Sequence, residues 1–184
     1  PDELNGDLLL MESRNSVRNI TAHLLEKGCT LPGFMGDIGY AQSNRERYEG
    51  FCQALMDAGK TPNPSLCLTT PLGIDSYREE IDSFLSSLSR MPDAFVCASD
   101  YVACILMQLL EKRGLRVPED VAVSGFDNNI EDLLAENLTT VQVFNEELGS
   151  RLALQILYRI KYPHTPHEVT YLESKVLYRA STGD

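Results

Sequence analysis

The hydrophobic positions of the chain form short apolar runs that alternate with longer stretches of helical spacing. At the start, residues 7–12 predict a strand, residues 15–27 a helix that ends at Gly28, and residues 31–35 a second strand. Short apolar runs bounded by turn residues are typical of strands that are buried on both faces of a parallel sheet. These three elements bury too little to stand alone, so either the last helix packs onto them or part of their lobe lies upstream.

The same order continues along the rest of the chain. A helix is predicted at residues 44–58, because Tyr48, Phe51 and Leu55 have helical spacing and Gly59 follows. The other predicted elements are strands at residues 66–69, 93–98 and 121–126, helices at residues 76–89, 101–113, 131–135 and 145–161, an extended segment at residues 138–143 and a β-like tail at residues 169–178. Strands that alternate with helices predict an α/β fold with a parallel sheet between two layers of helices.

Acidic residues outnumber basic ones. The 184 residues include 27 Asp and Glu against 16 Lys and Arg, which gives a formal net charge of -11. Such a surface repels a phosphate backbone over most of its area, so we do not expect this chain itself to grip nucleic acid. The sequence has no apolar run of about 18 residues and no recognisable signal peptide. We therefore expect a cytoplasmic chain.

The sequence carries no motif of a metal site, a cofactor site or a catalytic centre. The cysteines are odd in number, lack CxxC spacing and are expected to be buried free thiols; they are Cys29, Cys52, Cys67, Cys97 and Cys104. His164 and His167 lie three apart, but no nearby run of ligands completes a metal site. A GxSxG elbow, a P-loop and an HExxH motif are absent. We expect no metal, no cofactor and no enzymatic activity.

Asp127 directly follows the apolar strand predicted at residues 121–126. In open α/β sheets, ligands bind outside the carboxyl ends of the strands. Asp127 is therefore a candidate ligand-binding residue. An Asx-turn, or an N-cap for the short segment that follows, is the structural alternative.

Arg47 is placed in the first turn of the helix predicted at residues 44–58, where the helix dipole disfavours a cation. Its side chain either pairs with Glu46 or Glu49 at the surface or aims a planar fork of donors into a cleft. Ser43 precedes this helix and either caps it or points its hydroxyl group at a ligand, and capping is favoured.

Ser99 and Asp100 precede the apolar helix predicted at residues 101–113. Serine and aspartate are preferred at the N-caps of helices, so capping is the favoured role for Asp100. For Ser99, capping and ligand binding are both open.

Four ordered motifs and a tail resemble one known family. They are RERYEGFCQAL (Arg45–Leu55), PDAFVCASDYVA (Pro92–Ala103), GLRVPEDVAVSGFDN (Gly114–Asn128), LTTVQ (Leu138–Gln142) and LESKVLYRAST (Leu172–Thr182). Their order and spacing are similar to those of the lactose-repressor/galactose-repressor (LacI/GalR) family of bacterial transcription regulators. The resemblance covers nearly the whole chain.

The resemblance implies a periplasmic-binding-protein-like α/β fold, in which two Rossmann-like lobes with parallel sheets close on a small effector. Residues 1–36 would form part of the first lobe, residues 37–140 the second lobe, residues 141–165 a return helix on the first lobe, and residues 166–184 a closing strand and tail. The glycine-rich segment 33–39 would carry the crossing between the lobes. The first lobe is expected to be incomplete, because such regulators begin with a helix-turn-helix headpiece, a hinge and the first half of that lobe.

The resemblance also implies which residues contact the effector. They are Arg47, Asp127 and Ser99, with Ser43 beside them. The aromatic platform that many sugar sites of this family carry is replaced near Pro71 and Leu72 by aliphatic residues. The effector class therefore stays broad: a sugar, a purine or a related metabolite.

The chain is thus predicted to be the effector-binding and dimerisation domain of a LacI/GalR-type regulator. We expect a homodimer that contacts DNA only through a headpiece outside this chain. Two alternatives remain open: a periplasmic-type sugar-binding protein that shares the fold, and the same sensor fold joined to a different output domain.

Overall fold

The computed structural model describes residues 6–73, 75–129 and 136–184, and the chain divides into two compact units. Unit 1 comprises Pro1–Glu12 and Val143–Ser174, and unit 2 comprises Ser13–Gln142 and Lys175–Asp184. The chain therefore passes between the units at residues 12–13, 142–143 and 174–175. The helix predicted at residues 131–135 lies outside the described residues.

Unit 2 is built on a four-stranded parallel sheet. Its strands are β2 (Pro32–Met35), β3 (Cys67–Leu68), β4 (Ala94–Cys97) and β5 (Ala122–Ser124), in the spatial order β3-β2-β4-β5. The pairing of β2 with β4 runs from Pro32 opposite Ala94 to Met35 opposite Cys97, and every residue of both strands is buried. The predicted parallel sheet, buried on both faces, is confirmed.

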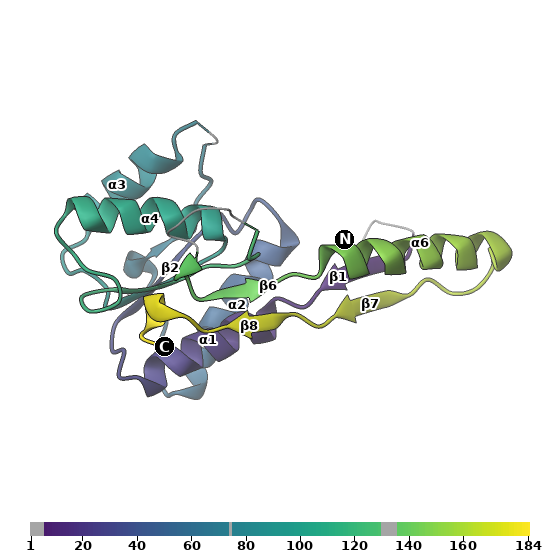
Figure 1. Ribbon diagram of the computed structural model, residues 1–184, viewed down its shortest axis with the longest axis horizontal. Coiled ribbons are helices and arrows are strands. Elements are labelled where there is room, and N and C mark those ends of the chain that lie inside the picture. The colour runs from purple at the N-terminus through teal and green to yellow at the C-terminus, as the bar shows by residue number, and fades with distance from the viewer. Residues whose placement is uncertain (1–5, 74, 130–135) are drawn as a thin grey trace. The chain divides into compact units, whose positions relative to one another are not determined.

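Two layers of helices cover this sheet (Figure 1). On one face, α2 (Gln42–Asp57) packs beside α1 (Arg14–Glu26), and the ring centroid of Phe51 lies 5.6 Å from that of Phe34 on β2. On the other face, α3 (Tyr77–Ser87) packs beside α4 (Asp100–Lys112). Because successive residues of a strand point to opposite faces, Phe34 packs against the layer that contains α2, and Met35 packs against the layer of α3 and α4.

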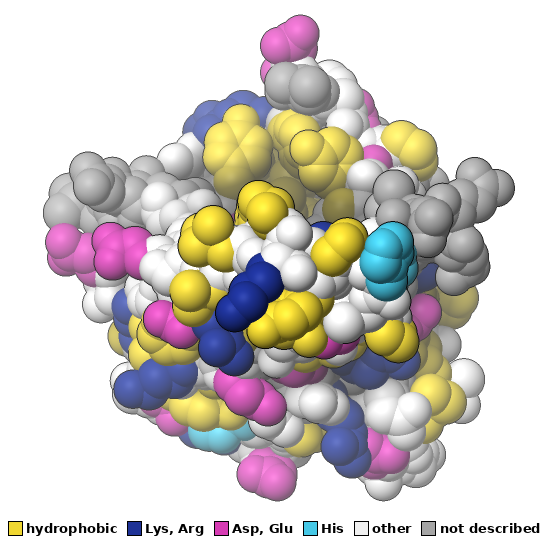
Figure 2. All heavy atoms as spheres, turned by 90° about the vertical axis from the view of Figure 1, so that its right-hand side faces the viewer, with side chains coloured by type: hydrophobic (Ala, Val, Ile, Leu, Met, Phe, Trp, Pro, Cys, Tyr) yellow, Lys and Arg dark blue, Asp and Glu magenta, His cyan; other side chains and the backbone are white. Residues whose placement is uncertain are grey.

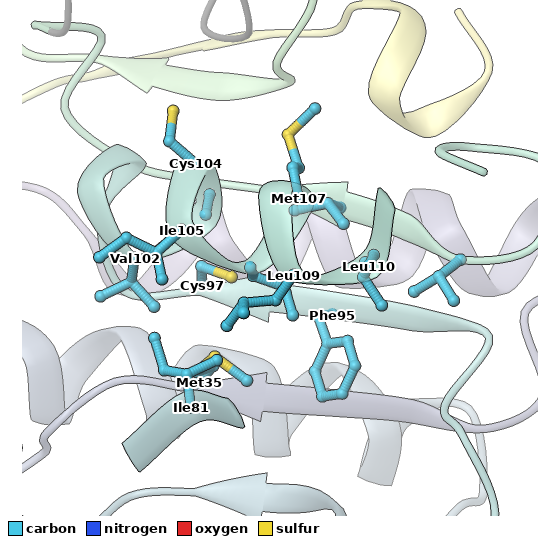
Figure 3. Packing of buried hydrophobic residues seen from close by; sticks show 14 of the residues in the cluster. Met35, Ile81, Phe95, Cys97, Val102, Cys104, Ile105, Met107, Leu109 and Leu110 are labelled. Atoms are coloured by element: carbon cyan, nitrogen blue, oxygen red, sulfur yellow. The ribbon is translucent and has the colours of Figure 1, made fainter. Parts of the chain in front are cut away.

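Helix α4 forms the centre of the larger core. Its side chains are apolar almost all round, and Leu106 and Leu110 have no exposed surface. Figure 3 shows Met35 and Phe95 on one side of α4, with Cys104 and Met107 pointing away from them. A helix that is apolar on all sides must be covered on all sides, which confirms the predicted deep burial of this segment.

Three short elements close unit 2. Strand β6 (Thr140–Gln142) pairs antiparallel with β8 (Lys175–Leu177), and the 3-10 turn η2 (Ala180–Thr182) follows. The Ser181 hydroxyl group donates to the Val123 carbonyl oxygen over 2.6 Å and accepts from the Thr139 amide over 2.8 Å. The C-terminal tail is therefore fastened to β5 and to the approach to β6. A second 3-10 turn, η1 (Pro64–Leu66), precedes β3.

Unit 1 consists of β1 (Leu8–Met11), β7 (Val169–Leu172) and α6 (Asn145–Lys161), and β1 pairs parallel with β7. Asp7 holds the helix: its Oδ2 accepts from Arg159 Nε and Gln155 Nε2, each over 3.0 Å. These bonds, with the Glu168 amide, keep the pKa of Asp7 well below its usual range. No residue of α6 is buried, and Figure 2 shows hydrophobic side chains at the surface on this side.

The predicted division of the chain differs from these units in two places. Residues 13–36 were expected in the first lobe, but α1 packs on α2 and β2 lies at the centre of the four-stranded sheet of unit 2. The glycine-rich segment 33–39 therefore belongs to β2 and the loop after it, and the chain passes between the units before α1. The tail predicted at residues 169–178 is two strands, β7 and β8, in different units.

Gly50 lets α1 and α2 cross closely. A Cβ atom added at Gly50 would lie 2.2 Å from the Arg14 carbonyl oxygen and 3.2 Å from the Arg18 amide nitrogen. Backbone atoms cannot swing aside as a flexible side chain can, so a methyl group at this position forces the helices apart. This contact explains why the motif that contains Arg47 and Phe51 has a glycine between them.

We predict that Gly50→Ala lowers the free energy of unfolding by about 1–3 kcal/mol, the usual cost of overpacking. The matched control is Gly149→Ala in α6, where a new Cβ meets nothing within 4 Å. There the alanine is expected to stabilise by roughly 0.5–1 kcal/mol, because glycine loses more backbone entropy in a helix. Urea unfolding followed by circular dichroism measures the free energy of unfolding of both variants. Equal effects of the two substitutions would contradict the close crossing of α1 and α2 at Gly50.

Candidate functional site

A cavity of about 220 Å³ lies at the carboxyl edge of the sheet in unit 2. Its walls come from the loop after β2, the first turns of α2, the end of β4 and the turn after β5. The lining residues are Gly36, Asp37, Tyr40, Ala41, Ser43, Asn44, Arg47, Tyr77, Ala98, Ser99, Val102 and Asp127. All four residues that the sequence analysis proposed as effector contacts therefore line the same cavity.

The position of the cavity follows from the strand order β3-β2-β4-β5. After β2 the chain moves outward to β3 on one side, and after β4 it moves outward to β5 on the other. Between β2 and β4 the direction of winding reverses, and this switch point is where open α/β sheets bind ligands. Gly36 follows β2 and Ala98 follows β4, so the cavity lies at the switch point.

Arg47 projects from the second turn of α2, one turn later than the sequence suggested, because the helix begins at Gln42. Its side chain is only 11% exposed. The Nη1 atom donates to the Ala98 carbonyl oxygen over 2.5 Å, and the guanidinium carbon lies 3.7 Å from the ring centroid of Phe126. The planar cation is thus held between the end of β4 and the end of β5.

Burial and charge act on the guanidinium group in opposite directions. Burial lowers the pKa of Arg47, whereas the carboxylate groups of Asp127, Asp100 and Glu46 raise it. Arginine stays protonated even in buried positions, so the cavity carries a fixed positive charge. Among the described residues, Arg47 Nε is buried and has no hydrogen-bond partner.

Asp127 faces Arg47 across the cavity from a left-handed turn. The distance from Arg47 Nη2 to Asp127 Oδ1 is 3.5 Å. The φ angles are +111° at Asp127 and +49° at Asn128, a region that residues other than glycine rarely adopt. Burial raises the pKa of Asp127, and the positive charge of Arg47 opposes this effect. The N-cap alternative for Asp127 concerns a segment outside the described residues.

Ser99 and Asp100 have different roles. Ser99 is the N-cap of α4, and its Oγ atom accepts from the Val102 amide over 3.3 Å while it lines the cavity. The predicted cap role of Asp100 is wrong: its Oδ1 atom accepts from the Thr140 hydroxyl over 2.6 Å. The backbone amides of Asn128 and Asn129, in the turn after β5, stabilise the ionised form of the Asp100 carboxylate. Burial raises the pKa of Asp100 to about 6.

Ser43 is the second residue of α2, and the N-cap is Ala41. The favoured capping role of Ser43 is therefore wrong, and its hydroxyl group is one of the polar groups that line the cavity. Effector binding by Ser43, as by Arg47, Asp127 and Ser99, stays a prediction.

Two aromatic residues of the cavity were missed from the sequence. Tyr77, the first residue of α3, packs edge-on against Tyr101 with ring centroids 5.6 Å apart. Tyr40 is 78% exposed and is positioned by Asp37, whose Oδ1 accepts from the Gly39 amide over 2.7 Å and the Tyr40 amide over 3.1 Å. An Asp-x-Gly-Tyr segment after a buried strand could have indicated this turn.

The described ranges lack two other kinds of feature. No group of three or more His, Cys, Asp or Glu side chains is placed to hold a metal ion. None of the helices there combines the length and apolar character needed to cross a membrane.

The sequence matches the family model of the periplasmic binding protein-like domain over residues 21–182. It is 28% identical to the HTH-type transcriptional repressor PurR of Aliivibrio salmonicida over 98% of this chain and 54% of that protein. The chain thus spans about half the length of this curated relative.

Solved structures of transcription regulators have a similar fold. The fold is similar to that of a LacI-family transcriptional regulator from Sanguibacter keddieii, with a TM-score of 0.85, 27% identity and coverage of 97% of this chain and 67% of the other. It is equally similar to the transcriptional regulator CelR in its complex with cellobiose, with a TM-score of 0.85, 26% identity and coverage of 98% and 55%.

Proposed function

Because the chain belongs to the periplasmic binding protein-like domain family and is related to the LacI-type transcription regulators, we propose that it is the effector-binding part of such a regulator. The effector is a small polar molecule that carries hydroxyl groups: a sugar, a purine or a related metabolite. It binds at the cavity between Arg47 and Asp127 in unit 2.

The spacing of Arg47 and Asp127 carries this proposal. Their 3.5 Å separation exceeds the roughly 2.7–2.9 Å of a direct charge-assisted hydrogen bond. A hydroxyl group can accept from a guanidinium and donate to a carboxylate, so a ligand hydroxyl satisfies both side chains at once. A single anionic or cationic ligand group would satisfy one of the pair and repel the other.

Neighbouring groups favour the same ligand class. Ser43 and Ser99 add hydroxyl groups to the cavity wall, and Tyr40 and Tyr77 add aromatic surface on which a sugar ring or a base can stack. CelR, whose fold is similar, was solved with cellobiose, which supports a sugar. The cavity is smaller than the roughly 300–1,000 Å³ of most ligand sites, so we expect a further wall to complete it.

The proposed mechanism is differential affinity. An effector that binds a closed arrangement of the protein better than an open one shifts the equilibrium between them by its difference in binding free energy. In a dimeric regulator this shift changes the spacing of two DNA-binding headpieces. The net charge of -11 supports an arrangement in which such a headpiece, outside this chain, contacts the DNA.

We also propose that the chain forms a homodimer, and the surface of unit 1 supports this. No residue of α6 is buried, and its apolar side chains include Leu157 at 63% and Ile160 at 73% exposure. Contiguous exposed apolar surface of this kind marks interaction sites.

Sedimentation velocity tests the dimer. At roughly tens of micromolar, a working range for modest affinity, the protein is expected to sediment faster than a monomer. Ile160→Glu should shift it toward the monomer, because a charge cannot be buried cheaply. Met56→Glu alters another exposed hydrophobic residue, 53% exposed and in unit 2, and should leave the assembly unchanged. A parent protein that remains monomeric over this range contradicts the proposal.

The site itself is tested by a binding screen. Thermal shift and calorimetry against D-ribose, cellobiose and adenine should identify a binder, and Arg47→Ala or Asp127→Ala should weaken it by about one to two orders of magnitude. This range corresponds to loss of charged hydrogen bonds worth roughly 1.5–3 kcal/mol. Arg116→Ala, which breaks an exposed ion pair with Asp120 away from the cavity, is the matched control. Two folded variants that bind as tightly as the parent would show that the site lies elsewhere.

A further inference from the structure

Asp100 is buried beside the cavity but does not line it. Asp100 is only 1% exposed. Ser99 and Val102 line the cavity, whereas Asp100 does not. A buried carboxylate costs stability unless hydrogen bonds compensate for the lost hydration. The hydrogen-bond partners of Asp100 therefore indicate its role in the structure.

Three donors converge on the Asp100 carboxylate. The Thr140 hydroxyl group donates to Oδ1 over 2.6 Å, and the backbone amides of Asn128 and Asn129 stabilise the ionised carboxylate and so lower its pKa. The backbone amide of Asp100 in turn donates to the Phe126 carbonyl oxygen over 2.8 Å. Asp100, at the start of α4, thus interacts with the turn after β5 through both its backbone amide and its side chain. The same side chain links this turn to β6.

The bonded turn is the strained segment that presents Asp127. Residues 127 and 128 have φ angles of +111° and +49°, and such conformations cost of order 1–3 kcal/mol each unless their surroundings hold them. The Asp100 carboxylate interacts with the backbone amides of two consecutive residues of this turn, Asn128 and Asn129, and this interaction supplies the support. Gly125 makes room for it, since a Cβ there would lie 2.3 Å from Asp100 Oδ1.

We propose that Asp100 is a positioning residue, whose carboxylate holds the turn at residues 127–129 in the conformation that directs Asp127 toward Arg47 and ties this turn to β6 through Thr140. The effector part of this inference rests on the proposed function, whereas the arrangement of the turn does not. The ionised carboxylate is the stronger acceptor for these donors, because a protonated carboxyl group loses its charge and turns one oxygen into a donor.

The groups around Asp100 give its titration a recognisable pattern. Cys97 on β4, Arg47 on α2 and Asp127 on the turn are electrostatically coupled to it. Burial is the largest cause of its raised pKa of about 6, the Thr140 bond lowers this pKa, and the charge of Asp127 raises it. As the pH falls through this value, Asp100 gains a proton and the turn loses an acceptor. The amides of Asn128 and Asn129 should report this step.

Nuclear magnetic resonance tests the arrangement without an effector. In the full chain, the Asn128 and Asn129 amide shifts should titrate with a midpoint near pH 6, and Asp100→Asn should abolish this titration. Thr140→Val should move the midpoint up, because it removes a bond that lowers the pKa, and Asp127→Asn should move it down. Thr21→Val is the matched control, since this buried hydroxyl bonds only within α1, to the Val17 carbonyl oxygen, in the described contacts.

A second measurement tests the consequence for binding. The best binder among D-ribose, cellobiose and adenine should bind Asp100→Asn about tenfold more weakly at neutral pH, the effect of roughly one lost hydrogen bond. Amide titrations that persist in Asp100→Asn, or do not shift in Thr140→Val, would overturn the proposal. So would unchanged binding by a folded Asp100→Asn protein. If no probe binds the parent, the proposed function fails and the amide titrations still decide the role of Asp100.

Discussion

Asp127 can face Arg47 only because the backbone after β5 turns through two left-handed residues, with φ angles of +111° and +49°. A regular continuation of the strand would alternate its side chains between the two helix layers and would not direct a carboxylate along the sheet edge. The turn is held by bonds from several elements. The Asp127 amide donates to the Val141 carbonyl oxygen over 3.0 Å, and Asn128 Oδ1 accepts from Arg179 Nη2 over 2.9 Å. The amides of the turn also stabilise the charge of the Asp100 carboxylate.

This dependence links segments that are far apart in sequence. Arg179 belongs to the C-terminal tail, which Ser181 also fastens to β5, and Thr140 lies on β6. The chain leaves unit 2 directly after β6 and returns directly before β8. The turn that carries Asp127 is thus bonded to β6 and to Arg179, which follows β8. The cavity is therefore linked by hydrogen bonds to segments that adjoin the points where the chain passes between the units.

The sequence predicted the layers and part of the site because those depend on local pattern. Asp127 follows an apolar run, and Arg47 is a cation in the early turns of a helix, so local pattern made each a candidate, and the resemblance to the LacI/GalR family favoured ligand binding over the structural alternatives. The boundary at residue 12 was missed because the partner of α1 is set by the close crossing at Gly50. Tyr77 and the role of Asp100 were missed because each depends on contacts with residues that are distant along the chain, Tyr101 on α4 and Thr140 on β6.

The strain at Asp127 is the central element of this account, and a comparison of Asp127→Gly with Asp127→Ala measures it most directly. Both variants lose the carboxylate and its interaction with Arg47, so their difference isolates the backbone. Urea unfolding should show the glycine variant more stable than the alanine variant by about 1–2 kcal/mol, because only glycine adopts φ near +111° without strain. At an ordinary position the order is the reverse, by roughly 0.4–1 kcal/mol. An alanine variant as stable as the glycine variant, or more stable, would contradict the account.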